Sequence, residues 1–315
     1  MTVIRSPLPA KATTISLAAS KRQPRRFQAE RILRISRVVS DLARAEAFYR
    51  DALGFFAIGR GPVDTMALAA LDAPDTAEEV VMQSGAQCIS LVSFAAAGLP
   101  YPSNSRSDDL WFQHMAIVVG DMDAAFTHLS SCEGWSPISE NGPQLLPPSN
   151  GGVRAFKFRD PDGHPLELIW FPHGQARGVW HAIDTGALFL GIDHSGLSVA
   201  STQRSLRFYR GLGLRVSDRS LNHGAAQTRL DGLAGTRVRV TGLRPASDIG
   251  PGLELLGYRP PGRPAGMTSA NDVLTDWITL AVSPSPDNLP CAVRDPDGHR
   301  LILVDHGEDV TGLPA

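Results

Sequence analysis

The alternation of apolar and polar residues predicts a chain of short strands with only a few helices. Three strand-like stretches, residues 32–39, 114–119 and 192–199, are rich in apolar and β-branched residues. A stretch with helical spacing follows each of them, at residues 43–53, 122–129 and 202–211. Asp41 and Asp121 stand where helix N-caps belong, and Gly54 stands where a helix would end. Further strands are expected over residues 88–94, 152–159, 166–171, 214–218, 237–243, 253–258, 277–282, 291–295 and 301–305.

Two short motifs repeat along the chain. The sequence Arg-Asp-Pro-Asp-Gly-His occupies residues 159–164 and recurs at residues 294–299. Phe-Tyr-Arg occupies residues 48–50 and recurs at residues 208–210, each time shortly before a Leu-Gly pair. The Asp-Pro-Asp-Gly segment predicts a tight turn between strands, because Pro fixes φ and Gly tolerates positive φ. The repeats divide the chain into four βαβββ units, and we expect the helix of the fourth to be shortened or missing.

This arrangement resembles the vicinal oxygen chelate superfamily, which includes glyoxalase I, extradiol dioxygenases and bleomycin-resistance proteins. The resemblance spans about residues 31–307 and rests on the Phe-Tyr-Arg helix end combined with the Asp-Pro-Asp-Gly-His turn. It implies an α+β fold in which the four units pair into two incomplete barrels. The first half, residues 30–175, and the second half, residues 188–309, would each contribute two units.

The resemblance also implies a metal ligand at the start of the first strand of a unit and another in its last strand. In the second unit these positions hold His114 and Glu167, and in the third they hold His194 and Glu254. The first unit has Arg34 and about Ser90 there, and the fourth has Asp276 and Ile302. Glu167 and Glu254 stand among leucines, and a carboxylate buried without a partner is costly unless a metal binds it.

The distribution of these residues predicts how the units pair. Pairing within each half would leave two broken sites, with Asp276 as an uncertain third ligand of the second. Pairing the second unit with the third would assemble His114, Glu167, His194 and Glu254 around one divalent ion, leaving the first and fourth units as a metal-free pair. We therefore expect the central pairing, although a dimer that exchanges units would give a similar result. Two imidazoles and two carboxylates suit Zn, Ni, Co, Mn or Fe, and the sequence does not choose among them.

The implied function is that of a metal-dependent isomerase, epimerase or lyase of the glyoxalase type. It would act by proton transfer next to a carbonyl or hydroxyl of a small oxygenated substrate, with Glu167 and Glu254 as candidate bases. One alternative is an extradiol-type Fe(II) ring-cleaving dioxygenase. The other is a non-catalytic small-molecule-binding protein of the resistance type. His164 and His299, which follow the two turn glycines, are interpreted as structural.

Composition narrows the function classes further. The 315 residues carry a net charge of −2, which argues against nucleic acid as a partner, and no apolar run is long enough to span a membrane. Three scattered cysteines predict neither disulfides nor a thiolate metal site, so we expect a reducing, cytoplasmic compartment. The sequence leaves open whether the protein is a monomer or a homodimer. Residues 1–29 carry six basic residues and no acid, which predicts a disordered basic tail. An organelle-targeting role for this tail stays open.

Overall fold

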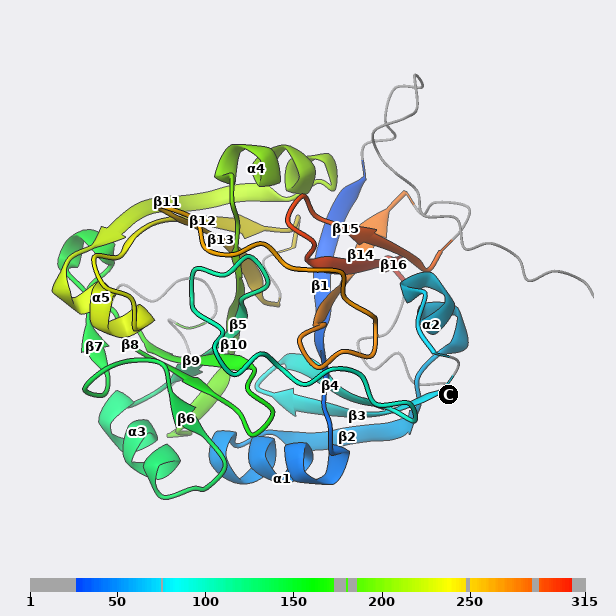
Figure 1. Ribbon diagram of the computed structural model, residues 1–315, viewed down its shortest axis with the longest axis horizontal. Coiled ribbons are helices and arrows are strands. Elements are labelled where there is room, and N and C mark those ends of the chain that lie inside the picture. Colours follow the sequence, from blue (N-terminus) through cyan, green and yellow to red (C-terminus); the bar gives the residue numbers. More distant parts are fainter. Residues whose placement is uncertain are drawn as a thin grey trace, which may run out of the picture.

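Strand pairing divides the chain into two sheets that do not follow the order of the sequence (Figure 1). The computed structural model describes residues 27–74, 76–172, 180, 186–247, 250–284 and 289–307. In these residues one sheet has the order β15-β16-β14-β1-β4-β3-β2, and the other has the order β11-β12-β13-β10-β5-β9-β8-β6, with β7 beside β8. The strands of the first sheet are β1 (Gln28–Val38), β2 (Phe56–Pro62), β3 (Ala77–Ser84), β4 (Gln87–Phe94), β14 (Trp277–Ser283), β15 (Cys291–Arg294) and β16 (Arg300–Asp305). The strands of the second are β5 (Gln113–Val119), β6 (Ser136–Pro137), β7 (Gln144–Leu145), β8 (Arg154–Arg159), β9 (Pro165–Trp170), β10 (Phe189–Ser198), β11 (Arg215–His223), β12 (Arg237–Arg244) and β13 (Gly252–Tyr258).

The order of the strands confirms the predicted α+β fold and the central pairing. The first and fourth units form one sheet, joined where β1 pairs with β14. The second and third units form the other sheet, joined where β5 pairs with β10. Both junctions are antiparallel, whereas the first and last strands of each unit are parallel neighbours. Each half of the sequence therefore contributes strands to both sheets.

The helices begin and end close to where the sequence predicts. Helix α1 (Leu42–Leu53) is capped by the Asp41 side chain and ends at Gly54, whose φ of 68° suits glycine. Asp121 caps α3 (Met122–Ser130), and Ser201 caps α4 (Thr202–Gly211). Two short helices were not expected: α2 (Thr65–Leu71) and α5 (Ala225–Asp231). A short 3₁₀ helix, η1 (Pro148–Asn150), also lies in the second unit. Within the described residues the fourth unit has no helix, as predicted.

Two hydrophobic cores bind the sheets to one another. One core joins α1 and α3 to strands of both sheets and draws nearly all of its residues from the first half of the chain, including Tyr49, Ile89 and Ile117. The other joins α4 to strands of both sheets and includes Tyr209, Leu255 and Leu301, mainly from the second half. Units of the same half thus share a core, while units of opposite halves share a sheet.

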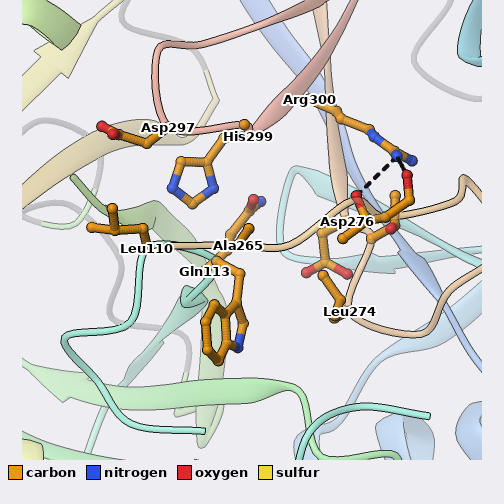
Figure 2. Close-up of a pocket in the computed structure, with 12 residues that line it drawn as sticks. Leu110, Gln113, Ala265, Leu274, Asp276, Asp297, His299 and Arg300 are labelled. Carbon is orange, nitrogen blue, oxygen red and sulfur yellow. Dashed lines mark hydrogen bonds between the residues drawn. The ribbon is translucent and has the colours of Figure 1, made fainter. Parts of the chain in front are cut away.

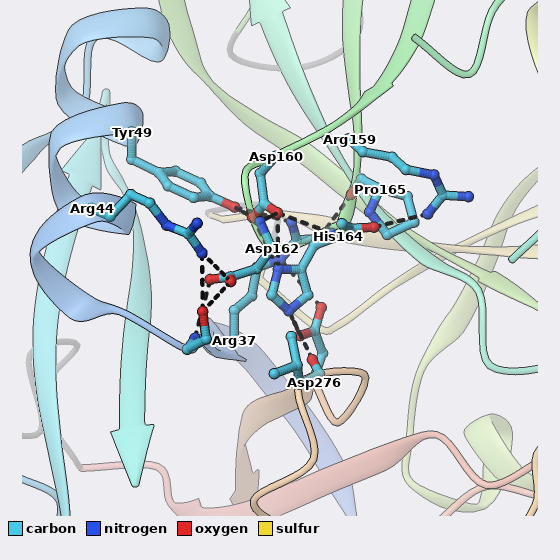
Figure 3. Close-up of polar contacts among 12 residues, drawn as sticks. Arg37, Arg44, Tyr49, Arg159, Asp160, Asp162, His164, Pro165 and Asp276 are labelled. Carbon is cyan, nitrogen blue, oxygen red and sulfur yellow. Dashed lines mark hydrogen bonds and ion pairs between the residues drawn. The ribbon is translucent and has the colours of Figure 1, made fainter. Parts of the chain in front are cut away.

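The two repeated motifs meet at these cores (Figure 3). The hydroxyl of Tyr49 donates to Asp160 Oδ2 over 3.1 Å, and the hydroxyl of Tyr209 donates to Asp295 Oδ2 over 3.3 Å. The second acid of each turn reaches the start of a helix, since Asp162 accepts from the backbone nitrogen of Ser40. The motifs that carry the resemblance are therefore contacts that fasten one sheet to the other.

The ends of the chain are described only in part. Residues 1–26, most of the predicted basic tail, lie outside the described residues, while residues 28 and 29 already belong to β1. Among the helices of the described segments, we find none with the length and apolar character needed to cross a membrane.

Candidate metal centre

The concave face of the second sheet encloses a cavity of about 300 Å³, and all four predicted ligands line it. His114 lies on β5, Glu167 on β9, His194 on β10 and Glu254 on β13. The strand register explains why these four side chains lie on the same face of the sheet. Ala116 pairs with Glu167, and Gly196 pairs with Glu254, so each glutamate aligns with a residue two positions after a histidine. Side chains two residues apart on a strand share a face.

Three of the four side chains converge, and the fourth, Glu254, contacts one of them, His194. His114 Nε2 lies 2.9 Å from Glu167 Oε2 and 3.3 Å from His194 Nε2. His194 Nε2 is 3.8 Å from Glu167 Oε2. His114, Glu167 and His194 are all buried and form a group able to hold a metal ion. Glu254 Oε2 is 3.5 Å from His194 Nε2, and its side chain keeps 25% exposure.

These separations fit the spacing of ligands around one ion. Bonds of about 2.0–2.2 Å to nitrogen and oxygen place neighbouring ligands of one ion about 3.0–3.5 Å apart. The distances of 2.9, 3.3 and 3.5 Å lie at or near that range, and the 3.8 Å between His194 Nε2 and Glu167 Oε2 lies slightly above it. The donor set of imidazole and carboxylate is also one that divalent first-row metals accept.

A β-bulge brings in a residue that the sequence did not single out. The pairing of β10 with β5 shifts between Ile192 and His194, so Asp193 lines the same cavity as its neighbour. Asp193 Oδ2 lies 2.9 Å from His194 Nδ1, and its Oδ1 accepts from Trp180 Nε1 over 2.7 Å. A carboxylate on the second ring nitrogen orients a metal-binding histidine and fixes its tautomer. Strict alternation along a strand gives no sign of a bulge, which is why this residue was missed.

The ring of His114 occupies space that only a glycine leaves free. Gly196 pairs with His114 across the junction of the two units. A Cβ atom at residue 196 would lie 2.2 Å from Cε1 of the His114 ring, far inside contact distance. Gly196 therefore determines where this imidazole lies.

Burial and neighbouring charges set the protonation of the cluster. Burial lowers the pKa of His114 to about 4, although Glu167 opposes the shift. Burial would raise the pKa of Glu167, but its contacts with His114, Lys157 and His194 lower it to about 2. The pKa of His194 is raised to about 9, because Glu254 and Asp193 outweigh its burial. Burial raises the pKa of Glu254. At neutral pH the cluster thus presents an uncharged His114 and an ionised Glu167, the forms that bind metals, whereas His194 is protonated and would release a proton when it binds an ion.

A second group of polar residues lies under α5. Lys157 of β8 is directly opposite Glu167 in the strand register, and its ammonium lies 2.6 Å from Asp231 Oδ1 of α5. Burial would lower the pKa of Lys157, but Asp231 raises it, so the pair is charged. Arg154, three residues earlier on the same strand, pairs instead with exposed Asp123. No sequence signal points to Asp231, because it lies on a short helix that the pattern does not predict.

Among the described residues, the first sheet has no comparable site. The equivalent positions hold Arg34 and Ser90 from the first unit, as predicted, and Ile302 from the fourth. The fourth position is Trp277 rather than the predicted Asp276, because Ile302 pairs with Thr279, two residues after Trp277. A shift of one residue moves a side chain to the other face of the sheet. Trp277 and Ile302 are buried in an apolar cluster that includes residues of α2, and Arg34 forms an ion pair with Glu79.

Asp276 contributes to a different contact. Its Oδ2 lies 3.2 Å from Nε of Arg37, a fully buried cation, and its Oδ1 is 3.7 Å from His164 Nε2 (Figure 3). His164 Nδ1 contacts Asp160 at 2.9 Å, and His164 Nε2 contacts the carbonyl oxygen of Val273 at 2.8 Å. These bonds agree with the structural interpretation of His164. His299 is buried in the same way, 3.0 Å from the carbonyl oxygen of Ser198.

A smaller cavity lies between the sheets, where Gln113, Asp276 and His299 meet (Figure 2). Its volume of about 30 Å³ has room for roughly two water molecules. It is therefore too small for an organic substrate, and the cavity of the second sheet is the candidate active site.

Comparison with known proteins agrees with this geometry. The profile of the Glyoxalase/Bleomycin resistance protein/Dioxygenase superfamily matches residues 31–168. The uncharacterized protein YaeR of Escherichia coli is 31% identical over 136 residues, which is 42% of this chain and 91% of YaeR.

Solved structures extend the similarity over both halves. A variant of glyoxalase I from Zea mays superposes with a TM-score of 0.58 at 17% identity, covering 88% of this chain and 92% of that one. A Bacillus subtilis protein described as a candidate dioxygenase gives a TM-score of 0.56 at 14% identity, covering 90% of this chain and 87% of its own. At such identities the likeness concerns the fold.

Proposed function

The chain belongs to the glyoxalase, bleomycin resistance protein and dioxygenase superfamily, and on that premise we propose that it is a metal-dependent enzyme of the glyoxalase type. It would be an isomerase, epimerase or lyase that moves a proton next to a carbonyl or hydroxyl of a small oxygenated substrate. The observation that carries this proposal is the close group of His114, Glu167 and His194 inside a substrate-sized cavity, with Glu254 in contact with His194.

Each residue has a separate role in the proposal. His114, Glu167 and His194 would hold the ion, with Glu254 as a fourth ligand. When bound, a divalent ion polarises substrate oxygen and so acidifies the neighbouring C–H bond. Asp193 orients His194 through the hydrogen bond at Nδ1.

Glu254 is the better placed of the two candidate bases. Glu167 is buried and tied to His114, whereas Glu254 faces the cavity and contacts the cluster only at His194 among the contacts described. In the proposed reaction Glu254 Oε2 accepts a proton from substrate carbon and returns it to the neighbouring carbon or to the other face. Apolar side chains of the cavity, such as Ile169 and Leu256, exclude bulk water from this transfer.

A second function is supported by one specific feature. The close group of His114, Glu167 and His194 is two histidines and one carboxylate, the ligand set of many non-haem Fe(II) oxygenases. An extradiol-type dioxygenase would use this group and leave Glu254 outside it. Oxygen consumption with catechols separates this function from proton transfer.

Metal analysis of the protein purified without chelators tests the core of the proposal. We expect about one divalent ion per chain, a loss of that ion in His114→Ala, and retention in His223→Ala, which removes an exposed histidine at the end of β11. Glu254→Gln should abolish exchange of solvent deuterium into a hydroxy-ketone substrate. A wild-type protein without a divalent ion would contradict the proposal, and so would unchanged metal binding by His114→Ala.

A further inference from the structure

The cavity has a second polar region, separate from the proposed ligands. We call Lys157, Gln227, Asp231 and Tyr258 the α5 cluster, because two of its members lie on that helix. Tyr258 lies on β13, four residues after Glu254, so both side chains face the cavity. All four residues of the cluster are at most 4% exposed.

The hydrogen bonds of the α5 cluster are incomplete in a specific way. Asp231 accepts from Lys157 Nζ over 2.6 Å and from Gln227 Nε2 over 2.8 Å. These bonds fix the Gln227 amide with its nitrogen toward Asp231, which leaves Oε1 without a partner among the described residues. The hydroxyl of Tyr258 likewise has no partner at normal hydrogen-bond distance among the described residues, although Asp231 lies close enough to add to the effect of burial in raising the pKa of Tyr258.

Both atoms belong to residues of the cavity wall. Buried polar atoms are normally hydrogen bonded, and those that are not indicate a missing partner such as water or a ligand. Gln227 Oε1 is an acceptor and needs a donor, while a phenol hydroxyl can donate or accept. A ligand hydroxyl can act in both ways and would serve either atom.

The charges of the cluster argue against an anionic ligand. Lys157 is its only cation, and the contact with Asp231 neutralises it. The rest of the cavity wall adds one arginine, Arg219, against the carboxylates of Glu167, Asp193, Asp218 and Glu254. A divalent ion at the proposed site would offset part of that negative charge, so no excess of positive charge is left for a phosphate or a carboxylate.

We propose that the α5 cluster is a hydroxyl-binding subsite, in which Gln227 Oε1 and the Tyr258 hydroxyl bind a hydroxyl group of an uncharged, polyhydroxylated substrate. This inference rests on the proposed function only in taking the cavity as the substrate site. It adds the substrate class and two specificity-determining residues, which touch the substrate away from the reacting carbon.

Isothermal titration calorimetry on the full chain with its metal tests the subsite. The probes are the neutral polyols myo-inositol, glucose and xylitol. Cyclohexanediol serves as a compound with only two hydroxyl groups, and inositol phosphate serves as an anion. We expect at least one polyol to bind more tightly than the diol and the phosphate. Tyr258→Phe and Gln227→Met should each weaken that polyol about 3- to 30-fold, as expected for one lost hydrogen bond, and leave diol binding unchanged.

Tyr101→Phe is the matched control, because Tyr101 is also a buried tyrosine whose hydroxyl has no hydrogen bond to the described residues, yet it does not line this cavity. Circular dichroism and metal content should be unchanged in all three variants. Equal polyol binding by wild type and Tyr258→Phe would overturn the subsite, as would tighter binding of the phosphate or no binding of any polyol. A protein that binds polyol through Tyr258 and Gln227 but holds no metal would refute the proposed function and leave the subsite standing.

Discussion

Asp193 illustrates how one residue outside the proposed ligand set determines what a ligand can do. Its carboxylate accepts hydrogen bonds from Trp180 and Arg244 as well as from the His194 ring, so it is held on three sides. These partners lower the pKa of Asp193 against the effect of burial and keep it ionised. His194 is therefore held with Nε2 toward the cluster.

We expect Asp193→Ala to weaken metal binding about 10- to 100-fold, as losses of such orienting partners generally do. The measurement is a competition titration of zinc against a chelator of known affinity. Asp123→Ala is the control, since Asp123 is an exposed acid paired with Arg154. An affinity equal to that of wild type would mean that Asp193 does not orient His194.

Gly196 acts on the site through space rather than through a hydrogen bond. Gly196→Ala forces the His114 ring aside, because the new Cβ would lie 2.2 Å from Cε1. We expect a stability loss of about 1–3 kcal/mol, the usual cost of overpacking, together with weaker metal binding.

Denaturant unfolding and the zinc titration measure the two effects of this substitution. Gly211→Ala is the matched control, because a Cβ there meets no atom within 4 Å. If Gly196→Ala bound zinc as wild type does, His114 would not be required in its present position.

At the scale of elements, capping residues predict where a helix begins or ends, whereas a short helix positioned by tertiary packing has no such signal in the sequence. Asp41, Gly54 and Asp121 mark helix ends that follow from capping chemistry within a few residues. Helices α2 and α5 have seven residues each, and so little sequence carries no helical period. Their positions depend on what they cover: α2 packs on the apolar face of the first sheet, and α5 on the cavity of the second.

The residues of the candidate site likewise divide into those that the sequence predicts and those that it does not. His114, Glu167, His194 and Glu254 could be named because each holds a fixed position in a repeated unit. Asp193 lines the cavity because of a β-bulge, and the position of Asp231 depends on a short helix that the sequence does not predict. Asp276 was misplaced by one residue, since the sequence does not fix the register of a strand. Periodic features were thus predictable, and departures from the period were not.

The turn between β8 and β9 predicts a pH dependence of stability. Both ring nitrogens of His164 face acceptors, Asp160 and the carbonyl of Val273, so the ring fits best as a cation with two donors. Burial would lower the pKa of His164, but Asp160 and Asp276 raise it above 6.5. The charged ring therefore stabilises the fold fully below about pH 6.5, and this contribution is lost as the pH rises through the raised pKa.

We expect His164→Gln to cost about 1–3 kcal/mol near pH 6 and less near pH 9, because glutamine cannot donate in both directions. Urea unfolding at both pH values measures the difference. His306→Gln, at an exposed histidine, should show no such trend. A cost that is the same at both pH values would mean that the ring is not charged in the folded protein.

At the scale of the whole molecule, the sheets and the hydrophobic cores connect different pairs of units. Sheets join units of opposite halves, through β1 with β14 and β5 with β10. Units of the same half are joined instead by the hydrophobic cores and by two side-chain hydrogen bonds, Tyr49–Asp160 and Tyr209–Asp295. Neither half can be removed without cutting both sheets at a central strand, so the four units should unfold together as one cooperative body.

This interlocking predicts the behaviour of a chain cut between residues 172 and 186. Each half alone exposes β1 and β5, or β10 and β14, as unpaired strands with apolar faces, so it should aggregate or self-associate. Co-expressed halves should instead assemble one to one and bind about one metal ion per pair, because His114 and Glu167 come from one half and His194 and Glu254 from the other. Size-exclusion chromatography with metal analysis measures both outcomes. Monomeric halves that each bind an ion would show that the shared sheet does not build the site, whereas metal in the assembled pair alone would locate it at the junction of β5 and β10.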